Sequence, residues 1–244
     1  MGLSLSKYIS DTGFCSRREA DRLIEDCRVT INGKDAHKGN RVEPGDTVAV
    51  DGEPLKKKKT AVYIALNKPR GITCTTDLQD KSNIIDFMQY KSRIFPIGRL
   101  DKLSEGLIFL TNDGDIVNKI LRAGNGHEKE YIVDVDKPIH PEFIKKMRAG
   151  VRIPGAVTAP CYVKQIGDRK FKIILTQGLN RQIRRMCETL DYRVTALKRI
   201  RIMNIQLGGL PVGKWRYFSP AELDVLLDAV KHSRNSLDGD GMGE

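Results

Sequence analysis

The order of strand-like and helix-like segments beyond residue 60 constrains the fold more than any other feature of this sequence. Runs rich in β-branched or aromatic residues, bounded by Gly, Pro, Asn or Asp, predict strands at 61–66, 94–97, 107–110, 131–135, 159–165, 170–176 and 194–203. Helices are predicted at 84–90, 116–123, 141–149, 181–190 and 220–231. Strands outnumber helices and the two do not alternate regularly, so we predict an α+β domain with a mixed, mainly antiparallel sheet.

The first fifty residues form a separate pattern. Apolar residues recur at helical spacing from Leu5, and Ser16 stands three residues before Glu19, as in a capping box that opens a second helix. Strand-like segments follow at 29–31, which runs into an Asn-Gly turn, and at 47–50. We therefore predict a small module of two helices plus a small sheet.

Composition shifts along the chain suggest the domain boundaries. We expect the small module at 4–55, a lysine-rich linker at 56–60, the larger domain at 61–232 and a disordered tail at 233–244, which is rich in Ser, Gly, Asp and Asn. A lysine run is typical of a solvated linker, with contact to phosphate as the alternative.

The charge of the chain favours a polyanionic partner. Its 244 residues carry 42 Lys and Arg against 31 Asp and Glu, a net charge of +11, which suits nucleic acid first and an anionic membrane surface second. No apolar stretch approaches the roughly 20 residues that span a bilayer. The five cysteines form no CxxC pair. Because an odd, scattered set suits neither a disulfide framework nor a zinc site, we expect a cytoplasmic protein.

A pair of arginines in the small module is a candidate phosphate-binding site. Arg18 and Arg22 stand four residues apart on one face of the second predicted helix, next to Arg17 at its start. The alternative is that these arginines pair with the acidic residues of the same helix, and the residues alone leave the two readings equal.

Three motifs shift that balance. The runs SRREA, VTING and PGDTVAV occur in this order between residues 4 and 50, and the segment resembles the S4 RNA-binding domain. The resemblance implies that Arg17, Arg18 and Arg22 contact RNA. The chain departs from the family at Cys27, where a glycine is usual in the turn after the second helix. A residue with a Cβ resists a positive φ at such a position, so the local turn geometry is in doubt.

A second set of motifs lies in the larger domain. KPRG at 68–71, IGRLDKLSEGL at 97–107, LTNDG at 110–114, KEY at 129–131 and QIRRM at 182–186 occur in one order. Together they resemble the bacterial pseudouridine synthases of the ribosomal small-subunit type, over residues 61 to about 220. The segments 125–131 and 201–204 look most like the branch of that family that comprises the large-subunit pseudouridine synthases F.

The resemblance implies an isomerase that converts a uridine of RNA to pseudouridine. Asp101 matches the catalytic aspartate, which acts either as a nucleophile at C1′ or as a base that removes the 2′ proton. Arg184 matches the arginine that pairs with it, and Tyr131 matches the aromatic residue that stacks on uracil. Arg99 matches a residue at the pocket rim that could fill the gap left by a flipped base. Without the motifs, Asp101 would read as a turn residue and Tyr131 as core.

Other basic residues are candidate RNA contacts, some facing phosphate and some turned away. These are Lys68, Arg181, Arg185, Arg199 and Arg201. The four histidines have no ligand spacing, so we expect no metal. The reaction is an isomerisation within one nucleotide, so we expect no cofactor either.

Substrate and partner expectations follow from the same resemblance. It implies 23S ribosomal RNA as substrate and leaves a tyrosine transfer RNA anticodon open as a second one. We expect a monomer without an obligate protein partner and without membrane attachment. The rival hypotheses are a non-catalytic S4-type RNA-binding or ribosome-assembly protein, and a glycosidase that uses Asp101 with Glu105 as an acid/base pair.

Overall fold

The computed structural model describes residues 2–56, 60–121, 126–231 and 233, which divide into two compact units. The first unit comprises Met1–Val62, Tyr90–Ile94 and Asn112–Gly114, and the second Tyr63–Gln89, Phe95–Thr111 and Asp115–Glu244. Most of the predicted linker at 56–60 and of the predicted tail at 233–244 lies outside the described residues.

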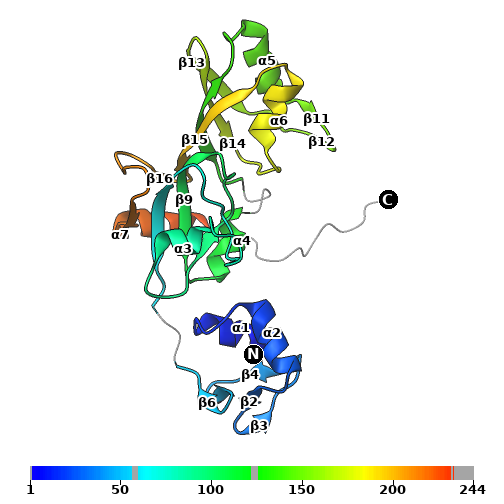
Figure 1. Ribbon diagram of the computed structural model, residues 1–244, viewed down its shortest axis with the longest axis vertical. Helices are drawn as coiled ribbons and strands as arrows, with labels where there is room; N and C mark the ends of the chain where they lie inside the picture. Colours follow the sequence, from blue (N-terminus) through cyan, green and yellow to red (C-terminus); the bar gives the residue numbers. More distant parts are fainter. Residues whose placement is uncertain (1, 57–59, 122–125, 232, 234–244) are drawn as a thin grey trace. The chain divides into compact units, whose positions relative to one another are not determined.

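The first unit contains the two helices and the small sheet that the sequence predicts (Figure 1). Its elements are β1 (Leu3–Ser4), α1 (Leu5–Asp11), α2 (Arg17–Glu25), β2 (Val29–Ile31), β3 (Lys34–Asp35), β4 (Arg41–Val42), β5 (Val48–Val50) and β6 (Glu53–Pro54). Strands β3-β2-β5-β6 form an antiparallel sheet in this order, and β1 pairs with β4. The apolar faces of both helices and of the sheet share one core, so this unit has its own hydrophobic centre.

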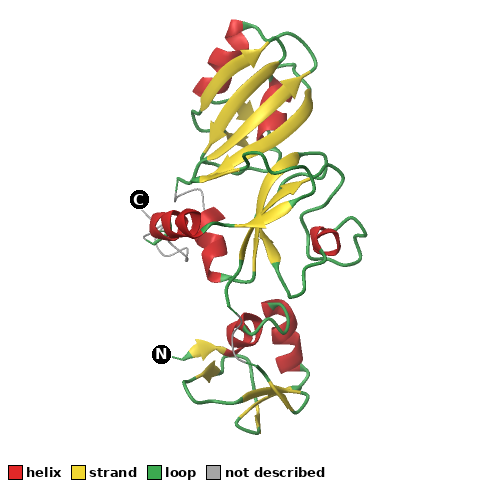
Figure 2. Cartoon of the chain, turned by 90° about the vertical axis from the view of Figure 1, so that its left-hand side faces the viewer, coloured by secondary structure: helices red, strands yellow, loops and turns green. Residues whose placement is uncertain are grey.

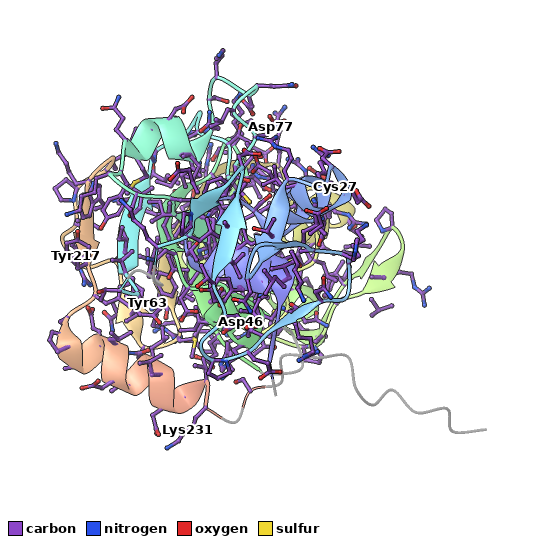
Figure 3. All side chains as sticks on the ribbon, turned by 90° about the horizontal axis from the view of Figure 1, so that it is seen from below. Cys27, Asp46, Tyr63, Asp77, Tyr217 and Lys231 are labelled. Atoms are coloured by element: carbon purple, nitrogen blue, oxygen red, sulfur yellow. The ribbon has the colours of Figure 1, made fainter. Side chains whose placement is uncertain are left out.

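The predicted cap of α2 is present in this unit, and the turn after α2 has a positive φ at a residue other than glycine. The Ser16 side chain accepts a hydrogen bond from Glu19 N and so caps α2. Only this half of a capping box is present here, whereas Ser219 and Glu222 form both halves at the last helix. Cys27, labelled in Figure 3, has a φ of 55°. The turn therefore keeps the left-handed geometry that favours glycine, although the side chain disfavours it.

The second unit is built on a nine-stranded sheet, which Figure 2 shows as a continuous twisted surface flanked by helices. Its elements are β7 (Tyr63–Lys68), α3 (Ile84–Met88), β8 (Phe95–Ile97), β9 (Glu105–Thr111), α4 (Asp115–Leu121), β10 (Lys129–Val135), α5 (Pro141–Ala149), β11 (Arg152–Ile153), β12 (Ala156–Val157), β13 (Tyr162–Gly167), β14 (Lys170–Leu175), α6 (Gln182–Thr189), β15 (Val194–Ile202), β16 (Ile205–Gln206), β17 (Trp215–Tyr217) and α7 (Pro220–Ala229). The strand order is β13-β14-β10-β15-β9-β7-β17, with β16 on β15 and β8 on β9.

One parallel pair joins two antiparallel halves of this sheet. Strand β15 pairs with β9 in parallel at Lys198–Glu105 and Arg199–Gly106, and the other described pairs in the sheet are antiparallel. Gly106 has a φ of 110°, and a Cβ there would lie 2.2 Å from Arg199 O. The close approach of the two backbones therefore requires glycine at this position. The predicted mixed, mainly antiparallel sheet is confirmed.

Two layers of apolar side chains hold the helices to the sheet. One core cluster joins α4 and α7 to β7, β8 and β9, with Phe109 and Phe218 in an edge-to-face contact at 4.8 Å between ring centroids. At the other end of the sheet, Phe143 of α5 packs on Phe171 of β14 at 5.4 Å. None of the described helices is both long and apolar enough to cross a membrane.

The predicted elements of the larger domain are all present, with shifted ends. Helix α5 covers the predicted 141–149, whereas β7 begins and ends two residues later than the predicted 61–66. The short strands β11, β12, β16 and β17 were not predicted, because two or three residues carry no measurable alternation. Strand β17 forms a sheet edge, where Tyr217 lies across from the β7 strand that carries Tyr63 (Figure 3).

The junction at Gly106 leads to a stability prediction. We expect Gly106→Ala to lower the free energy of unfolding by about 2 kcal/mol or more, because the Cβ meets Arg199 backbone atoms and the φ is unfavourable. Gly209→Ala is the matched control, since a Cβ there meets nothing within 4 Å. Urea denaturation of both variants measures the effect. Equal stability of the two variants would contradict the close approach.

Candidate active site

Residues from several parts of the second unit converge on one pocket of about 560 Å³. Its wall includes the loop between β8 and β9, strand β10, strand β15 and the start of α6. Asp101, Tyr131 and Arg184, the three residues predicted to be catalytic, all line it. They are separated by 30 and 53 residues along the chain (131 − 101 and 184 − 131), so the sheet brings them together.

Asp101 lies in the turn that leads into β9. Ser104 N donates to Asp101 O at 2.9 Å, so the backbone of Asp101 makes the turn that a purely structural reading predicts. Its side chain does not take part in that turn. Among the described residues the Asp101 carboxylate has one charged neighbour within ion-pair distance, Arg184, and it is about one third exposed to the pocket.

Lys68 is a correction to the predicted RNA contacts. Its side chain is completely buried, and its Nζ donates to the carbonyl oxygens of Pro69 and Ile72 at 2.8 Å each and to Lys102 O at 3.5 Å. Burial lowers the pKa of Lys68, and the negative charge of Asp101 partly offsets this. Lys68 therefore cannot contact RNA phosphate in this structure. It joins the loop at Pro69–Ile72 to Lys102, the neighbour of Asp101 in the chain.

Arg184 is held by three oxygen atoms. Its Nη2 donates to Ser104 Oγ at 3.0 Å, its Nη1 donates to Val194 O at 3.3 Å, and its Nε lies 3.5 Å from Asp101 Oδ2. The last contact is an ion pair without hydrogen-bond geometry, and Nε has no other partner. Burial lowers the pKa of Arg184, and the Asp101 carboxylate opposes this shift. The guanidinium thus lies beside the Asp101 carboxylate without forming a hydrogen bond to its oxygen atoms.

Strand β10 presents different chemistry on its two faces. Lys129 and Tyr131 both face the pocket, as alternate residues of one strand do. Glu130, between them, lies on the other face and pairs with Lys172 at 2.7 Å and Arg201 at 2.8 Å. Arg201 also pairs with Glu128 at 2.9 Å. The prediction that Arg201 contacts RNA is therefore not supported, because two carboxylates already balance its charge.

The remaining residues predicted to contact RNA differ in how far their side chains are exposed to solvent. Arg99 and Arg181 are exposed at the pocket lining, as expected of rim residues. Arg185 lies outside the lining, and its guanidinium donates to the carbonyl oxygens of Pro154 and Asn180. Arg199 is a correction as a phosphate contact, because only 4% of it is exposed and it forms part of the inner pocket wall. For Arg99, Arg181 and Arg185 a role in RNA binding stays a prediction.

Among the pocket residues that the sequence did not assign, Ser104 and Lys129 bear on the chemistry of the site. Ser104 anchors Arg184, and Lys129 lines the pocket beside Tyr131. The alternation of Lys129 with Tyr131 in the KEY motif was the available signal for the lysine, whereas no spacing rule points to Ser104. No group of three or more His, Cys, Asp or Glu side chains within the described parts of the chain could hold a metal ion, and the absence of a metal stays a prediction.

The arginines that the sequence predicts to bind phosphate in the first unit are exposed, and their role in RNA binding stays a prediction. Arg17, Arg18 and Arg22 are exposed on α2. Neither Arg18 nor Arg22 forms an ion pair with any residue that the structure describes, and Glu25 of the same helix pairs with Lys38 instead. The alternative reading, in which these arginines are neutralised by acids of their own helix, is thus not supported for Arg18 and Arg22.

Comparison with known proteins decides the family. The family model of RNA pseudouridylate synthases matches residues 62–189, and that of the S4 domain matches residues 4–48. The dual-specificity RNA pseudouridine synthase RluF of Escherichia coli (strain K12) is 55% identical over 235 residues, covering 96% of this chain and 81% of the relative.

The chain belongs to the RNA pseudouridylate synthase family. The ribosomal large subunit pseudouridine synthase B of Bacillus subtilis (strain 168) is 35% identical, covering 96% of this chain and 99% of that protein. A crystal structure of a pseudouridylate synthase matches with a TM-score of 0.68 and 27% identity, covering 92% of this chain and 99% of that one. The protein is therefore a pseudouridine synthase with an N-terminal S4 domain, an isomerase that converts uridine in RNA to pseudouridine.

The contacts of Arg184 predict a stabilising role for this pseudouridine synthase residue. We expect Arg184→Met to lower the free energy of unfolding by about 2 kcal/mol, because it leaves Ser104 Oγ and Val194 O without their donor and strands a partly buried carboxylate. The loss is smaller than for a fully buried ion pair because Asp101 is partly exposed.

Arg185→Met is the matched control for this measurement. It removes the same side chain from the next position of α6, where the contacts are solvent-exposed, so we expect a loss below about 1 kcal/mol. Urea denaturation compares the two variants. Equal losses in the free energy of unfolding would show that the interior contacts of Arg184 stabilise the protein no more than the exposed contacts of Arg185.

Proposed function

We propose that this pseudouridine synthase isomerises a specific uridine in 23S ribosomal RNA and accepts a tyrosine transfer RNA as a second substrate. Two relatives support the proposal by their names, one as a dual-specificity enzyme and the other as an enzyme of the ribosomal large subunit. The net charge of +11 and the exposed arginines of α2 suit a large polyanionic substrate.

The observation that carries the mechanism is the ion pair between Asp101 and Arg184 inside the pocket. The reaction needs one ionised carboxylate beside the ribose. Asp101 either bonds to C1′ or removes the C2′ proton as the N1–C1′ bond breaks. The freed base turns, and C5 bonds to C1′ as the Asp101–C1′ bond breaks or, on the other route, as the proton held by Asp101 returns to C2′. C5 then loses its proton and N1 gains one, which leaves Asp101 as the free carboxylate. Arg184 places a positive charge beside this carboxylate, with its Nε 3.5 Å from Asp101 Oδ2.

Tyr131 and Arg99 handle the base. The Tyr131 ring lines the pocket and is 9% exposed, which suits stacking on a uracil that must be held while it turns. Arg99 is exposed at the same lining and could occupy the space that the flipped nucleotide leaves. Both residues come from the chain that carries Asp101, so we propose a monomer without an obligate protein partner. We also propose that it works in the cytoplasm, and that it needs no metal or cofactor because the reaction is an isomerisation within one nucleotide.

The glycosidase alternative fails on geometry. Glu105 pairs with Lys198 at 3.4 Å and does not belong to the pocket lining, so it cannot act with Asp101 as an acid/base pair. A purely RNA-binding function is not favoured either, because binding alone would not require a carboxylate in a cationic pocket.

The first test concerns chemistry. We expect Asp101→Asn to abolish pseudouridine formation in 23S ribosomal RNA fragments while leaving RNA affinity within a few-fold, since the carboxylate contributes little to binding a polyanion. Nucleoside mass spectrometry under single-turnover conditions measures the product. Asp168→Asn, at an exposed position in the turn between β13 and β14, is the matched control and should keep full activity. Clear turnover by Asp101→Asn would refute the proposed role.

The second test concerns binding by the first unit. We expect the double variant Arg18→Gln, Arg22→Gln to lose affinity for the RNA and to reduce the slope of log affinity against log salt by about 2, because two phosphate contacts are lost. Its single-turnover rate at saturating protein should change little. Arg28→Gln is the control, because Arg28 is already paired with Asp51 at 2.6 Å. If both variants bound equally well, the module would have to bind RNA through another surface.

A further inference from the structure

Two cationic side chains form part of the inner wall of the pocket without a role in the mechanism above. Lys129 comes from β10 and Arg199 from the neighbouring strand β15, and they are only 8% and 4% exposed. Both line the pocket that contains Asp101. Arg199 pairs across the strands with Tyr131, and its guanidinium carbon lies 6.0 Å from the tyrosine ring centroid.

Both cations keep donors without a partner in the protein. Lys129 Nζ has one hydrogen bond, to His127 O at 3.0 Å. Arg199 Nε donates to Leu107 O at 2.6 Å, but its Nη2 is buried without any partner. No carboxylate in the described ranges pairs with either residue, whereas Glu130 on the other face of β10 pairs with two cations. The protein thus neutralises the outer face of this strand and leaves the pocket face positive.

Burying two unpaired cations costs stability. Burial lowers the pKa of Lys129 from 10.5 to about 8, and the neighbouring charge of Arg199 adds to the shift. A core selected for stability alone would place apolar side chains at such positions. The buried, unpartnered donors therefore indicate that an anion occupies the pocket during function.

The reaction itself supplies such an anion. When the N1–C1′ bond breaks heterolytically, both bonding electrons stay with the base, and the negative charge spreads from N1 over the O2 and O4 carbonyl oxygens. The base is anionic until C5 has bonded to C1′, and the later exchange of the C5 proton for one on N1 leaves its charge unchanged. Donors fixed at the carbonyl oxygens of this intermediate would be used more strongly after cleavage than before, which is the condition for catalysis.

We propose that Lys129 and Arg199 hold the detached uracil as an anion by donating hydrogen bonds to its carbonyl oxygens. This inference rests on the proposed function and deepens it. Asp101 and Arg184 act on the sugar side of the broken bond, while Lys129 and Arg199 stabilise the leaving base next to Tyr131. The two cations also keep the anion in place until it has turned its C5 toward the ribose.

A substrate with a modified base distinguishes stabilisation of the uracil anion from a structural role of Lys129. Fluorine at C5 withdraws electrons and stabilises the uracil anion by itself, so a 5-fluorouridine substrate needs less help from the protein. We expect Lys129→Met to slow the rearrangement of uridine by about 100-fold, the cost of removing one such donor. The same variant should slow the conversion of 5-fluorouridine by less than about 10-fold.

The experiment uses the full chain and an RNA transcript that carries either nucleoside. Nucleoside mass spectrometry follows the loss of uridine or 5-fluorouridine under single-turnover conditions. Thermal denaturation accompanies it, and we expect the melting temperature of Lys129→Met to be unchanged or raised, since an unpaired buried cation is removed. Lys164→Met, which removes an exposed lysine from β13, controls for the loss of one positive charge and should leave both rates unchanged.

The possible results separate this inference from the function on which it rests. Equal losses of rate on the two substrates would overturn the inference, as would a clear fall in melting temperature, which would indicate a structural role. A wild-type protein that converts no uridine would overturn the proposed function and this inference with it. A large loss on uridine with a small loss on 5-fluorouridine, in a variant of full stability, supports it.

Discussion

The active site depends on the short parallel junction between strands β9 and β15. Strands β9 and β15 meet in parallel over two residue pairs, and the meeting is possible because Gly106 has no side chain where it approaches Arg199. This junction joins the two antiparallel halves of the sheet. It places the turn that carries Asp101 next to the strands that carry Tyr131 and Arg199. The pocket is therefore a consequence of the topology, and each half alone would lack part of it.

Several buried cationic side chains of the second unit lie in or next to that pocket, around the Asp101 carboxylate. Lys68 is fully buried and binds backbone oxygens beneath the Asp101 turn, Arg184 pairs with Asp101, and Lys129 and Arg199 are left without carboxylate partners in the described structure. On the outer face of β10, Glu130 neutralises its cationic neighbours. This arrangement suits a reaction in which the sugar and the base separate and then rejoin. The Asp101 carboxylate can act on the electron-poor sugar, and the cations can stabilise the electron-rich base.

The sequence motifs predicted the three central residues of the pocket, but not the positions of the basic side chains around them. Asp101, Tyr131 and Arg184 were assigned from sequence runs that match a family, and the structure brings all three into one pocket, although their chemical roles stay proposals. Lys68 and Arg199 were misassigned because a basic residue near a motif reads as a phosphate contact. Only the tertiary structure shows that their side chains point inward.

For the fold as well, features set by neighbouring residues were predictable, whereas features set by contacts between distant segments were not. Helix caps, the Asn-Gly turn and strand alternation identified the main elements, since these signals lie within a few residues. The two-residue strands and the β9–β15 register were not accessible, because they depend on contacts between distant segments. The importance of Gly106 likewise appears only once β15 is placed beside it.

The most direct test of the central claim is a map of pseudouridines in ribosomal and transfer RNA from cells with and without this gene. The account predicts that at least one pseudouridine of 23S ribosomal RNA is missing without the gene, and that it returns with the wild-type chain but not when Asp101 is replaced by Asn. Identical maps in both cells, or full restoration by the Asp101→Asn chain, would contradict a uridine isomerase built on this carboxylate.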